Sequence, residues 1–505
     1  MLYYLNMQNI GDRIADLRET RGLTQADLAK KLKTTQSAVA RIESGRQNIS
    51  ADMLRRISHA LGKNLITLSP GTVNIKIEGG HKLTGTIETN TSKNGAVGLL
   101  CASLLNHGTT TLHKMPRIEE VHRIIEVLTS IGVKVDWRGN SVVITPPKKF
   151  NWRAIDVEAA RRTRSIVMFI GPLIHEFTSF SLPQSGGCKL GSRTVMPHFY
   201  ALEHFGVNIE TTNDAYKITR TDKKPDEIVL YESGDTVTEN ALFAAARTAT
   251  TTTIKYASAN YMVQEICHFL IKLGVKIEGI GTSTLTVTGR ANISDAIEYT
   301  LSEDPTDSMF FIAAAAVTNS SITITRCPID FLELELLKLE KMGWQYKRSK
   351  PYFSHNGQTK LVDLSTKPSK LKALKEHIHP AVYPGLNIDN LPFFAVIATQ
   401  AEGQTLIHDW VYEKRAIYFT ELDKLGADTV LADPHRIFIT GPTPLRGTEL
   451  ICPPALRPAT ILLIGMLGAR GESILRNIYS INRGYEKLIE RLGSLGAKVS
   501  YLEEF

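Results

Sequence analysis

The sequence predicts an α/β fold of six repeated βαβ-type units in two lobes, preceded by a small all-α domain. Six times, an amphipathic helical stretch leads to a glycine and then to a short strand. Glycine at the end of a helix permits the left-handed backbone that caps it. The repeat indicates one supersecondary unit used three times per lobe, with a ligand cleft between the lobes. The glycines, 68 to 83 residues apart, are Gly132, Gly206, Gly274, Gly343, Gly426 and Gly496.

Length and composition are those of a globular protein with more than one core. The chain has 505 residues, 43% hydrophobic and 22% charged, and this length exceeds what one core supports. No apolar run approaches the roughly 20 residues of a membrane-spanning helix, and the first residues lack the features of a secretory signal. Scattered cysteines without a CxxC pair indicate reduced thiols in a cytoplasm, not a disulfide frame or a zinc site. They are Cys101, Cys188, Cys267, Cys327 and Cys452.

Positive charge is concentrated near the N-terminus. The net charge is +8, and residues 1–70 contribute +5 of it, from 11 Lys and Arg against 6 Asp and Glu. This concentration predicts an anionic partner for the N-terminal segment. Ser69, Pro70 and Gly71 form a short linker between the domains. The predicted boundaries are 1–70 for the all-α domain and 73–505 for the repeat domain, with lobe one at about 94–302 and lobe two at about 73–93 and 303–505.

Residues 8–69 predict five short helices. The second and third, TQADLAKKL and TQSAVARIES, are joined by a tight turn, which is helix-turn-helix spacing. Thr24 and Thr35 are the expected N-caps, because threonine accepts a hydrogen bond from the first helical turn. The expected shared core consists of Leu28, Ala29, Leu32, Val39 and Ile42.

This segment resembles the Cro/C1-type repressor family in the strings RGLTQADLAKKL, TTQSAVARIESGR and ISADMLRRISHALG. In that family the third helix lies in the major groove of DNA. Gln36, Ser37 and Arg41 are therefore expected to contact bases, since glutamine pairs with adenine and arginine with guanine. Gln25 and Arg46 are expected to contact phosphates. The resemblance implies double-stranded DNA as partner and self-association on paired half-sites; the alternative is a protein-interaction module.

Four strings in the repeat domain carry a second resemblance. They are NTSKNGAVGLL (90–100), SLPQSGGCKLGSR (181–193), HPAVYPGLNID (379–389) and INRGYEKLIERLGSLGAKV (481–499). The region is similar to the enolpyruvyl transferase family, in particular to the UDP-N-acetylglucosamine 1-carboxyvinyltransferases. The resemblance implies an inside-out α/β barrel and transfer of the enolpyruvyl group of phosphoenolpyruvate to UDP-N-acetylglucosamine or a related nucleotide sugar. That reaction releases phosphate and is the first committed step of peptidoglycan precursor synthesis. No cofactor and no metal are implied.

The implied reaction needs cationic groups for a carboxylate and a phosphate. By the resemblance, Lys93 neutralises phosphoenolpyruvate and Asn94 holds the acceptor sugar. A single arginine is more often a solvated surface residue, but the planar guanidinium suits two-point pairing with such anions. The arginines at the family's phosphoenolpyruvate-binding positions are Arg164, Arg193, Arg415 and Arg483.

The reaction also needs a proton donor and a base. Cys188 lies in a glycine-rich basic loop, where Lys189 and Arg193 are expected to lower its pKa. The resemblance makes Cys188 the proton donor or a covalent nucleophile. It makes Asp389 the base for the acceptor hydroxyl, although an aspartate after a turn is also a common helix cap. Asp307 is either a cap or a sugar ligand.

Three departures from the family pattern affect the nucleotide half more than the phosphoenolpyruvate half. The family's acid-Leu-Arg triplet begins here with Ala455. Met196 replaces the uracil-contacting aspartate, although His198 is kept. The loop that holds the diphosphate reads Thr236-Val237-Thr238-Glu239, which places a repulsive acid beside the diphosphate. Three hypotheses therefore stay open: an active transferase, a transcriptional regulator that uses the transferase fold as a metabolite sensor, or an enzyme whose N-terminal domain only mediates assembly.

Overall fold

The computed structural model divides the chain into two compact units, Met1–Thr72 and Val73–Phe505. Among the described residues, no helix is long and apolar enough to cross a membrane. The residues that the structure describes are 14–15, 18–19, 21, 23–44, 53, 56–57, 60–61, 73–184 and 194–502.

In the first unit, α2 (Gln25–Leu32) and α3 (Gln36–Glu43) form the predicted helix pair. The predicted caps are confirmed, because Thr24 and Thr35 accept hydrogen bonds from the first turns of α2 and α3. The predicted core is confirmed as well, because all five of its residues are buried. The buried core of this unit consists of Ile14, Leu28, Ala29, Leu32, Val39, Ile42, Ile57 and Leu61.

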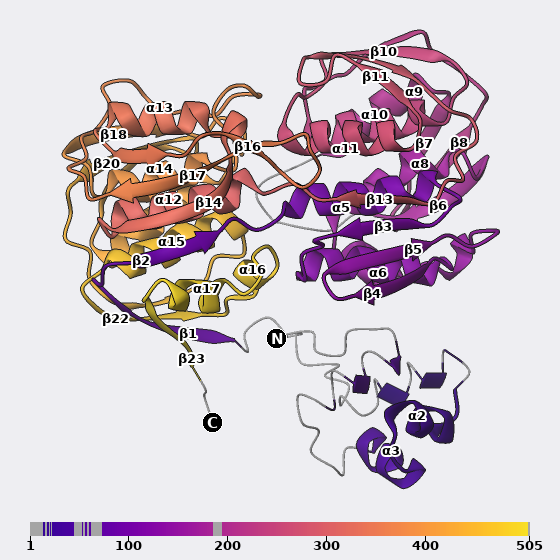
Figure 1. The fold of residues 1–505 in the computed structure, drawn as a ribbon, viewed down its shortest axis with the longest axis horizontal. Coiled ribbons are helices and arrows are strands. Elements are labelled where there is room, and N and C mark those ends of the chain that lie inside the picture. The colour runs from indigo at the N-terminus through magenta and orange to yellow at the C-terminus, as the bar shows by residue number, and fades with distance from the viewer. Residues whose placement is uncertain are drawn as a thin grey trace. The chain divides into compact units, whose positions relative to one another are not determined.

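The second unit contains six sheets within its described residues, three in each of two lobes (Figure 1). In lobe one the strand orders are β13-β3-β5-β4, β6-β8-β7 and β11-β12-β10-β9. The strands are β3 (Thr110–His113), β4 (Lys134–Arg138), β5 (Ser141–Thr145), β6 (Ser179–Pro183), β7 (Val207–Thr211), β8 (Ala215–Arg220), β9 (Glu227–Val229), β10 (Thr251–Lys255), β11 (Lys276–Glu278), β12 (Thr284–Thr288) and β13 (Ile297–Thr300). The α-helices are α5 (Lys93–Ala102), α6 (Glu119–Ser130), α7 (Val157–Arg161), α8 (Ile170–Leu173), α9 (Met196–Glu203), α10 (Asp235–Ala246) and α11 (Tyr261–Lys272); the 3₁₀ helices are η1 (Ser103–Leu105), η2 (Trp152–Ala154) and η3 (Arg164–Phe169).

In lobe two the strand orders are β21-β22-β1-β23, β15-β17-β14-β2 and β18-β20-β19, and β16 pairs with β17. The strands are β1 (Asn74–Gly79), β2 (Thr84–Glu88), β14 (Ser321–Pro328), β15 (Gln345–Arg348), β16 (Tyr352–Phe353), β17 (Lys360–Lys367), β18 (Gly403–His408), β19 (Asp428–Asp433), β20 (Arg436–Gly441), β21 (Glu449–Ile451), β22 (Gly471–Arg476) and β23 (Lys498–Leu502). The α-helices are α12 (Pro305–Val317), α13 (Glu333–Lys341), α14 (Leu391–Ala398), α15 (Leu456–Gly468), α16 (Tyr479–Asn482) and α17 (Leu488–Ser494); the 3₁₀ helices are η4 (Ile329–Phe331) and η5 (Ala416–Leu425).

The six repeat glycines hold the predicted positions. All have positive φ, between 77° and 98°, the region that glycine enters at little cost. They follow α6, α9, α11, α13, η5 and α17, and each leads into an edge strand of a different sheet. The repeat is therefore one helix-glycine-edge-strand unit for each of the six sheets.

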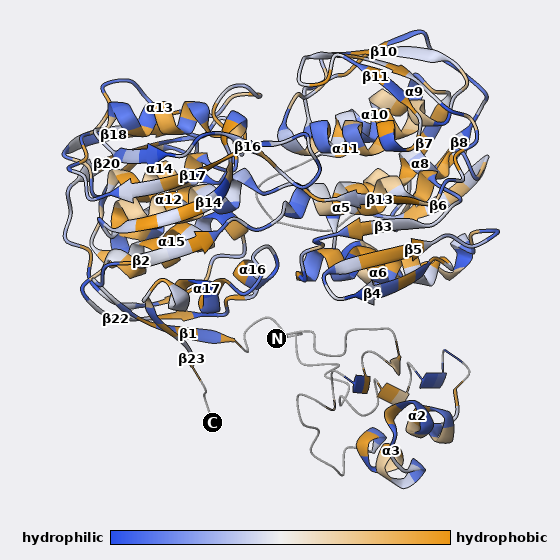
Figure 2. Ribbon diagram, in the orientation of Figure 1, coloured by the Kyte–Doolittle hydropathy of each residue, from blue (hydrophilic) through white to orange (hydrophobic). Residues whose placement is uncertain are grey.

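Apolar helices fill the interior of each lobe, with the sheets outside them. In lobe two, α12, α14 and α15 pack against one another, and nearly all of their residues are buried. In lobe one, α5 and α10 are likewise buried. In Figure 2, α14 and α15 are mainly orange, whereas the outer helix α13 also carries blue residues. Each described sheet is open, so the term barrel describes only the sheets grouped around these helices.

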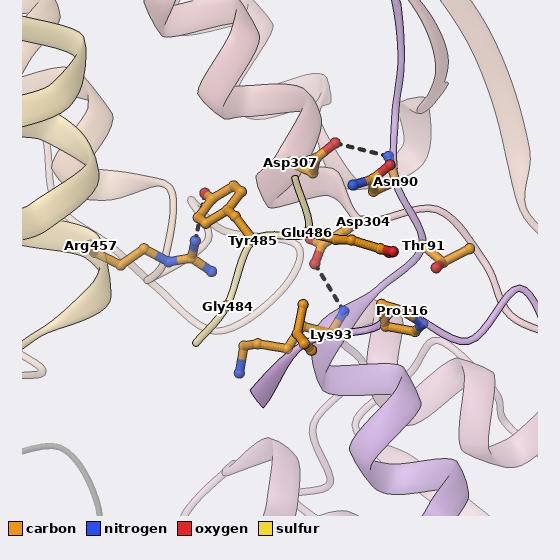
Figure 3. A pocket seen from close by; sticks show the side chains of 11 residues that line it. Asn90, Thr91, Lys93, Pro116, Asp304, Asp307, Arg457, Gly484, Tyr485 and Glu486 are labelled. Atoms are coloured by element: carbon orange, nitrogen blue, oxygen red, sulfur yellow. Dashed lines mark hydrogen bonds between the residues drawn. The ribbon is translucent and has the colours of Figure 1, made fainter. Parts of the chain in front are cut away.

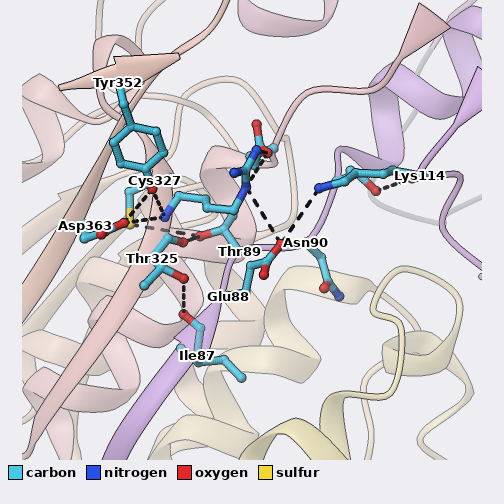
Figure 4. Close-up of polar contacts among 12 residues, drawn as sticks. Ile87, Glu88, Thr89, Asn90, Lys114, Thr325, Cys327, Tyr352 and Asp363 are labelled. Atoms are coloured by element: carbon cyan, nitrogen blue, oxygen red, sulfur yellow. Dashed lines mark hydrogen bonds and ion pairs between the residues drawn. The ribbon is translucent and has the colours of Figure 1, made fainter. Parts of the chain in front are cut away.

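The chain passes between the lobes twice, and the two passages lie side by side. Thr91 of the first passage forms an antiparallel bridge with Glu303 of the second. Nε of Arg326 donates to Oε1 of Glu303 at 2.8 Å. Glu88 interacts with both lobes, since its carboxylate lies 4.0 Å from Nζ of Lys114 and 3.7 Å from Nε of Arg326 (Figure 4). These ion pairs hold the crossing in a defined arrangement.

Candidate active site and helix-turn-helix face

A cavity of about 900 Å³ lies between the lobes and receives the first residues of several interior helices. Its wall includes Lys93 at the start of α5, Arg164 at the start of η3 and Arg457 in the first turn of α15. The N-terminal end of a helix carries partial positive charge and free N–H groups. These helix starts therefore bring three cationic side chains and backbone N–H groups to the cavity wall, which acidic side chains also line.

Two side-chain hydroxyl groups that cap helices determine the positions of two cationic side chains. Oγ of Ser92 accepts from the N–H of Gly95 at 2.9 Å, which starts α5 at Lys93. Oγ1 of Thr163 accepts from the N–H of Ser165 at 3.3 Å, which starts η3 at Arg164. Both caps are local sequence features that supply an acceptor to the orphan donors of a first turn. Each cap thus sets the position of the following cation.

Lys93 and Asn94 lie together on the first turn of α5. The N–H of Lys93 donates to Oδ2 of Asp304 at 3.3 Å, and Nδ2 of Asn94 donates to the hydroxyl of Tyr261 at 3.3 Å. Asp304 also caps α12, since it accepts from the N–H of Thr306 at 2.8 Å. One buried carboxylate therefore accepts hydrogen bonds from the first turns of α5 and α12, one interior helix from each lobe.

Asp389 is held by Arg457 in the described structure. Nη2 of Arg457 lies 3.1 Å from Oδ2 of Asp389, and its Nη1 donates to the hydroxyl of Tyr485 at 2.9 Å. Burial alone would raise the pKa of Asp389, but the charges of Arg457 and Arg415 outweigh it and lower that pKa to about 2. The helix-cap hypothesis for Asp389 is wrong, because the N-cap of α14 is Asn390.

A smaller cavity of about 20 Å³ adjoins this group. Figure 3 shows Arg457 beside Tyr485, with Lys93 and Asp304 next to them. A polar cavity of this size has room for one water molecule. Such a water would bridge charged groups of the two lobes.

The expected arginines differ in how the protein holds them. Nε of Arg483 lies 3.2 Å from Oε2 of Glu120, and Nη2 of Arg164 donates to the carbonyl of Thr194 at 2.7 Å. Arg415 is 1% exposed and forms an ion pair with the fully buried Asp409. All three arginines line the large cavity, and Arg415 reaches it as part of a neutralised pair.

His198 and Asp307 are both buried. His198 hydrogen-bonds to Thr236 at 3.3 Å. Burial, followed by the charge of Arg164, lowers the pKa of His198 to about 3, so its imidazole is neutral.

Asp307 pairs with Arg491 through both oxygens, at 2.7 and 2.8 Å. The capping hypothesis for Asp307 is wrong, because Asp304 caps α12. His198 lines the large cavity and Asp307 the small one.

The predicted diphosphate loop at residues 236–239 is helical. It forms part of α10, which starts with Asp235 after Gly234. Glu239 is 1% exposed, and burial, followed by the charges of Asp235 and Glu265, raises its pKa well above the ordinary value. This shift disfavours the charged form of Glu239, and the repulsion expected between this acid and a diphosphate stays a prediction.

Three expected site residues lie outside the described residues: Cys188, Arg193 and Arg46. The other four cysteines are buried and free, and burial raises the pKa of Cys452 to about 12. Sequence reasoning missed Glu120 and Tyr485, which the fold brings to the cavities. Tyr485 lies two residues after Arg483 in a matched string, so that string offered a signal for it.

The helix-turn-helix unit places its predicted contact residues on α2 and α3. Gln36, Ser37 and Arg41 are exposed on α3. Gln25 is half-buried: its Nε2 donates to Glu43 at 2.9 Å, and its Oε1 accepts from Gln36 at 3.3 Å. The two glutamines are therefore linked, and a residue expected to contact phosphate orients one expected to contact a base.

Comparison with known proteins identifies the family of the second unit. The family model described as EPSP synthase (3-phosphoshikimate 1-carboxyvinyltransferase) matches residues 77–492. The chain belongs to the enolpyruvyl transferase family. A helix-turn-helix family model matches residues 14–68. The chain thus joins an enolpyruvyl transferase to a helix-turn-helix domain.

Curated relatives within this family are similar over nearly their whole length. UDP-N-acetylglucosamine 1-carboxyvinyltransferase of Treponema denticola is 34% identical over 438 residues, which covers 85% of this chain and 99% of the relative. The protein of the same name from Bradyrhizobium diazoefficiens is 32% identical, covering 85% and 98%. The crystal structure of the enolpyruvyl transferase NikO from Streptomyces tendae superimposes with a TM-score of 0.74 at 23% identity, covering 86% of this chain and all of that one. The last comparison shows a shared fold.

Proposed function

We propose that the second unit transfers the enolpyruvyl group of phosphoenolpyruvate to the hydroxyl of a nucleotide sugar, UDP-N-acetylglucosamine or a close relative, and releases phosphate. The observation that carries this proposal is the large cavity. It gathers Lys93, Asn94, Arg164, Asp389 and Arg483, which come from distant parts of the chain. Such a set supplies anion clamps, an acceptor ligand and a carboxylate base. The names of the similar curated proteins support this substrate pair.

The proposed reaction proceeds by addition and elimination. The acceptor oxygen bonds to C2 of phosphoenolpyruvate while C3 takes a proton, for which we assign Cys188 as donor by family resemblance. The bond between C2 and the phosphate oxygen then breaks, C3 returns a proton to the thiolate of Cys188, and phosphate leaves. Asp389 takes the proton of the acceptor hydroxyl. Lys93 and Arg483 neutralise the anionic substrate and the departing phosphate.

Substrate binding is part of this proposal for Asp389. A carboxylate with a pKa of about 2 is a weak base at neutral pH. Anionic phosphoenolpyruvate beside Lys93 would offset part of the positive charge, mainly that of Arg457, that lowers that pKa. Asp389 therefore becomes a stronger base when phosphoenolpyruvate is bound, which favours reaction in the ternary complex.

Release of inorganic phosphate from phosphoenolpyruvate and UDP-N-acetylglucosamine tests the proposal. The wild-type protein is expected to release phosphate only when both compounds are present. Lys93→Ala, Asp389→Ala and Cys188→Ala are expected to reduce the rate at least 100-fold, within the range of general acid-base contributions. Phosphate release unchanged in all three variants would refute the assignment of the site.

A second candidate function is a metabolite-sensing transcriptional regulator. Ala455 supplies no carboxylate where the family triplet begins with an acid, and this departure favours binding over turnover. Ligands that close the lobes would then change the DNA affinity of paired N-terminal domains. This function predicts that phosphoenolpyruvate with UDP-N-acetylglucosamine shifts DNA affinity without phosphate release. DNA affinity that ignores both ligands would exclude it.

For the first unit we propose binding to double-stranded DNA as a homodimer, in the cytoplasm. Exposed Gln36, Ser37 and Arg41 on α3 support base contacts. Selection of bound sequences from random DNA by the full chain is expected to yield two half-sites about one helical turn apart. Arg41→Ala should relax the base preference at one position of each half-site. Binding with no sequence preference would instead support an assembly role for this domain.

A further inference from the structure

Glu120, near the start of α6, joins two groups that belong to different lobes. Its Oε2 lies 3.2 Å from Nε of Arg483 in lobe two, and its Oε1 accepts from the hydroxyl of Thr163 in lobe one at 3.0 Å. Glu120 is 7% exposed and lines the large cavity. Both oxygens of this buried carboxylate are therefore committed to residues at the site.

The contact with Arg483 leaves the outer part of the guanidinium available. Among the described residues, the only polar partner of the Arg483 side chain is Glu120, and the contact is through Nε. Arg483 is 28% exposed at its side chain and lines the same cavity. Nη1 and Nη2, which form the other edge of the planar group, are free to bind two oxygens of a phosphate or a carboxylate.

The contact with Thr163 links Glu120 to a second cation. Oγ1 of Thr163 also accepts from the N–H of Ser165, the bond that starts η3 at Arg164. Glu120 thus supports the hydroxyl that fixes the start of this helix. Loss of Glu120 would loosen Thr163 and Arg483 at the same time.

The charge of Lys93 adds a third link. Burial alone would raise the pKa of Glu120, but the charges of Lys93 and Arg483 outweigh burial and lower it. Glu120 is therefore an anion beside two cations, Lys93 of α5 and Arg483 at the end of α16. A negative charge at this point offsets the mutual repulsion of the cations before substrate arrives.

From this geometry we propose that Glu120 is a positioning residue for the phosphoenolpyruvate clamp. It holds Arg483 by Nε, so that both Nη atoms face the bound oxyanion, and it steadies Thr163 before Arg164. The proposal rests on the proposed transferase function. A positioning role differs from a structural role because it predicts weaker binding of phosphoenolpyruvate alone, with binding at the acceptor site unaffected.

Calorimetric binding of phosphoenolpyruvate and of UDP-N-acetylglucosamine to the full chain tests this role. Glu120→Ala is expected to weaken phosphoenolpyruvate binding at least tenfold and to raise its KM more than it lowers kcat. Glu120→Gln keeps an acceptor for Nε of Arg483 but loses the charge, and its affinity for phosphoenolpyruvate is expected to lie between those of Glu120→Ala and the wild type. Glu126→Ala is the control, because Glu126 is buried on the same helix and pairs with Arg123. It should leave both affinities unchanged.

The possible results separate the two proposals. If the wild type binds no phosphoenolpyruvate, both the transferase function and the role of Glu120 fail. If the wild type binds it and Glu120→Ala binds it equally well, the role of Glu120 is refuted while the function stands. Equal weakening of both ligands by Glu120→Ala, with a lower melting temperature, would also refute it, since a structural role produces that pattern.

Discussion

The charge state of each buried carboxyl depends on its neighbours. Asp389 and Glu120 are ionised because arginine and lysine charges outweigh the cost of burial. Glu239 and Glu265 have raised pKa values, mainly because burial in lobe one disfavours their charged forms. Sequence motifs located Asp389 but gave no sign of these differences, because a pKa depends on burial and on partners that are distant in sequence.

Glu265 makes stability depend on pH. Burial raises its pKa to about 7 from an ordinary value of 4.5. The unfolded chain ionises first as pH rises, so stability falls between about pH 4.5 and 7 and is constant above, with a loss of roughly 3 kcal/mol. Glu265→Gln should flatten this dependence, measured as urea midpoints at pH 5 and 8. The exposed control Glu278→Gln should keep the wild-type dependence, and equal dependence in all three proteins would contradict the prediction.

Arg457 stabilises the site by compensating Asp389. Arg457→Met leaves that carboxylate without its closest cation, and we expect the free energy of unfolding to fall by about 3 kcal/mol. Urea denaturation measures this loss, and Arg436→Met is the control because Arg436 forms an exposed pair with Asp433. The double variant with Asp389→Asn should regain part of the stability. A double variant no more stable than Arg457→Met would argue against this pairing.

At the scale of elements, glycine periodicity predicted the six repeats, and all six glycines have the expected positive φ. The threonine caps of α2 and α3 were predictable because each depends on only a few neighbouring residues in the sequence. The loop predicted at 236–239 was wrong. Asp235 in the first turn complements the helix dipole, and the apolar stretch that follows is buried against the interior of the lobe.

The start of α5 leaves little room for a side chain at Gly95. A Cβ there would clash with Oε2 of Glu265, so Gly95→Ala should lower the unfolding free energy by about 1–3 kcal/mol and displace Lys93. The control Gly493→Ala lies on α17, where nothing is within 4 Å of an added Cβ. Thermal unfolding compares the two variants. Equal melting temperatures would show that α5 and α11 adjust freely.

At the scale of the whole molecule, the chain joins two units that were predictable from composition and repeat length. Their separate cores lead us to expect that a fragment of residues 73–505 folds and keeps the transferase rate of the full chain within about twofold. DNA binding should be lost in that fragment and should fall steeply with salt in the full chain. Circular dichroism and the phosphate assay measure the first expectation. An unfolded or inactive fragment would show that the units depend on each other.

The cavity between the lobes could be predicted only in part. Matched strings located Lys93, Asn94, Asp389 and Arg483, the family position located Arg164, and the fold brings all five to one cavity. Residues that act through pairs across the lobes lie outside short motifs, because their partners are hundreds of residues away in sequence. Glu120 belongs to this class, and only the three-dimensional arrangement reveals it.

Mass spectrometry of the acceptor after reaction tests the central claim most directly. The full chain is incubated with phosphoenolpyruvate and UDP-N-acetylglucosamine, and both the nucleotide sugar and the released phosphate are measured. A working transferase should add one enolpyruvyl group to each acceptor molecule for every phosphate released, and Asp389→Ala should form neither product. Phosphate released without a change in the acceptor, or no change in either compound, would contradict the assignment of this chain as a UDP-N-acetylglucosamine carboxyvinyl transferase.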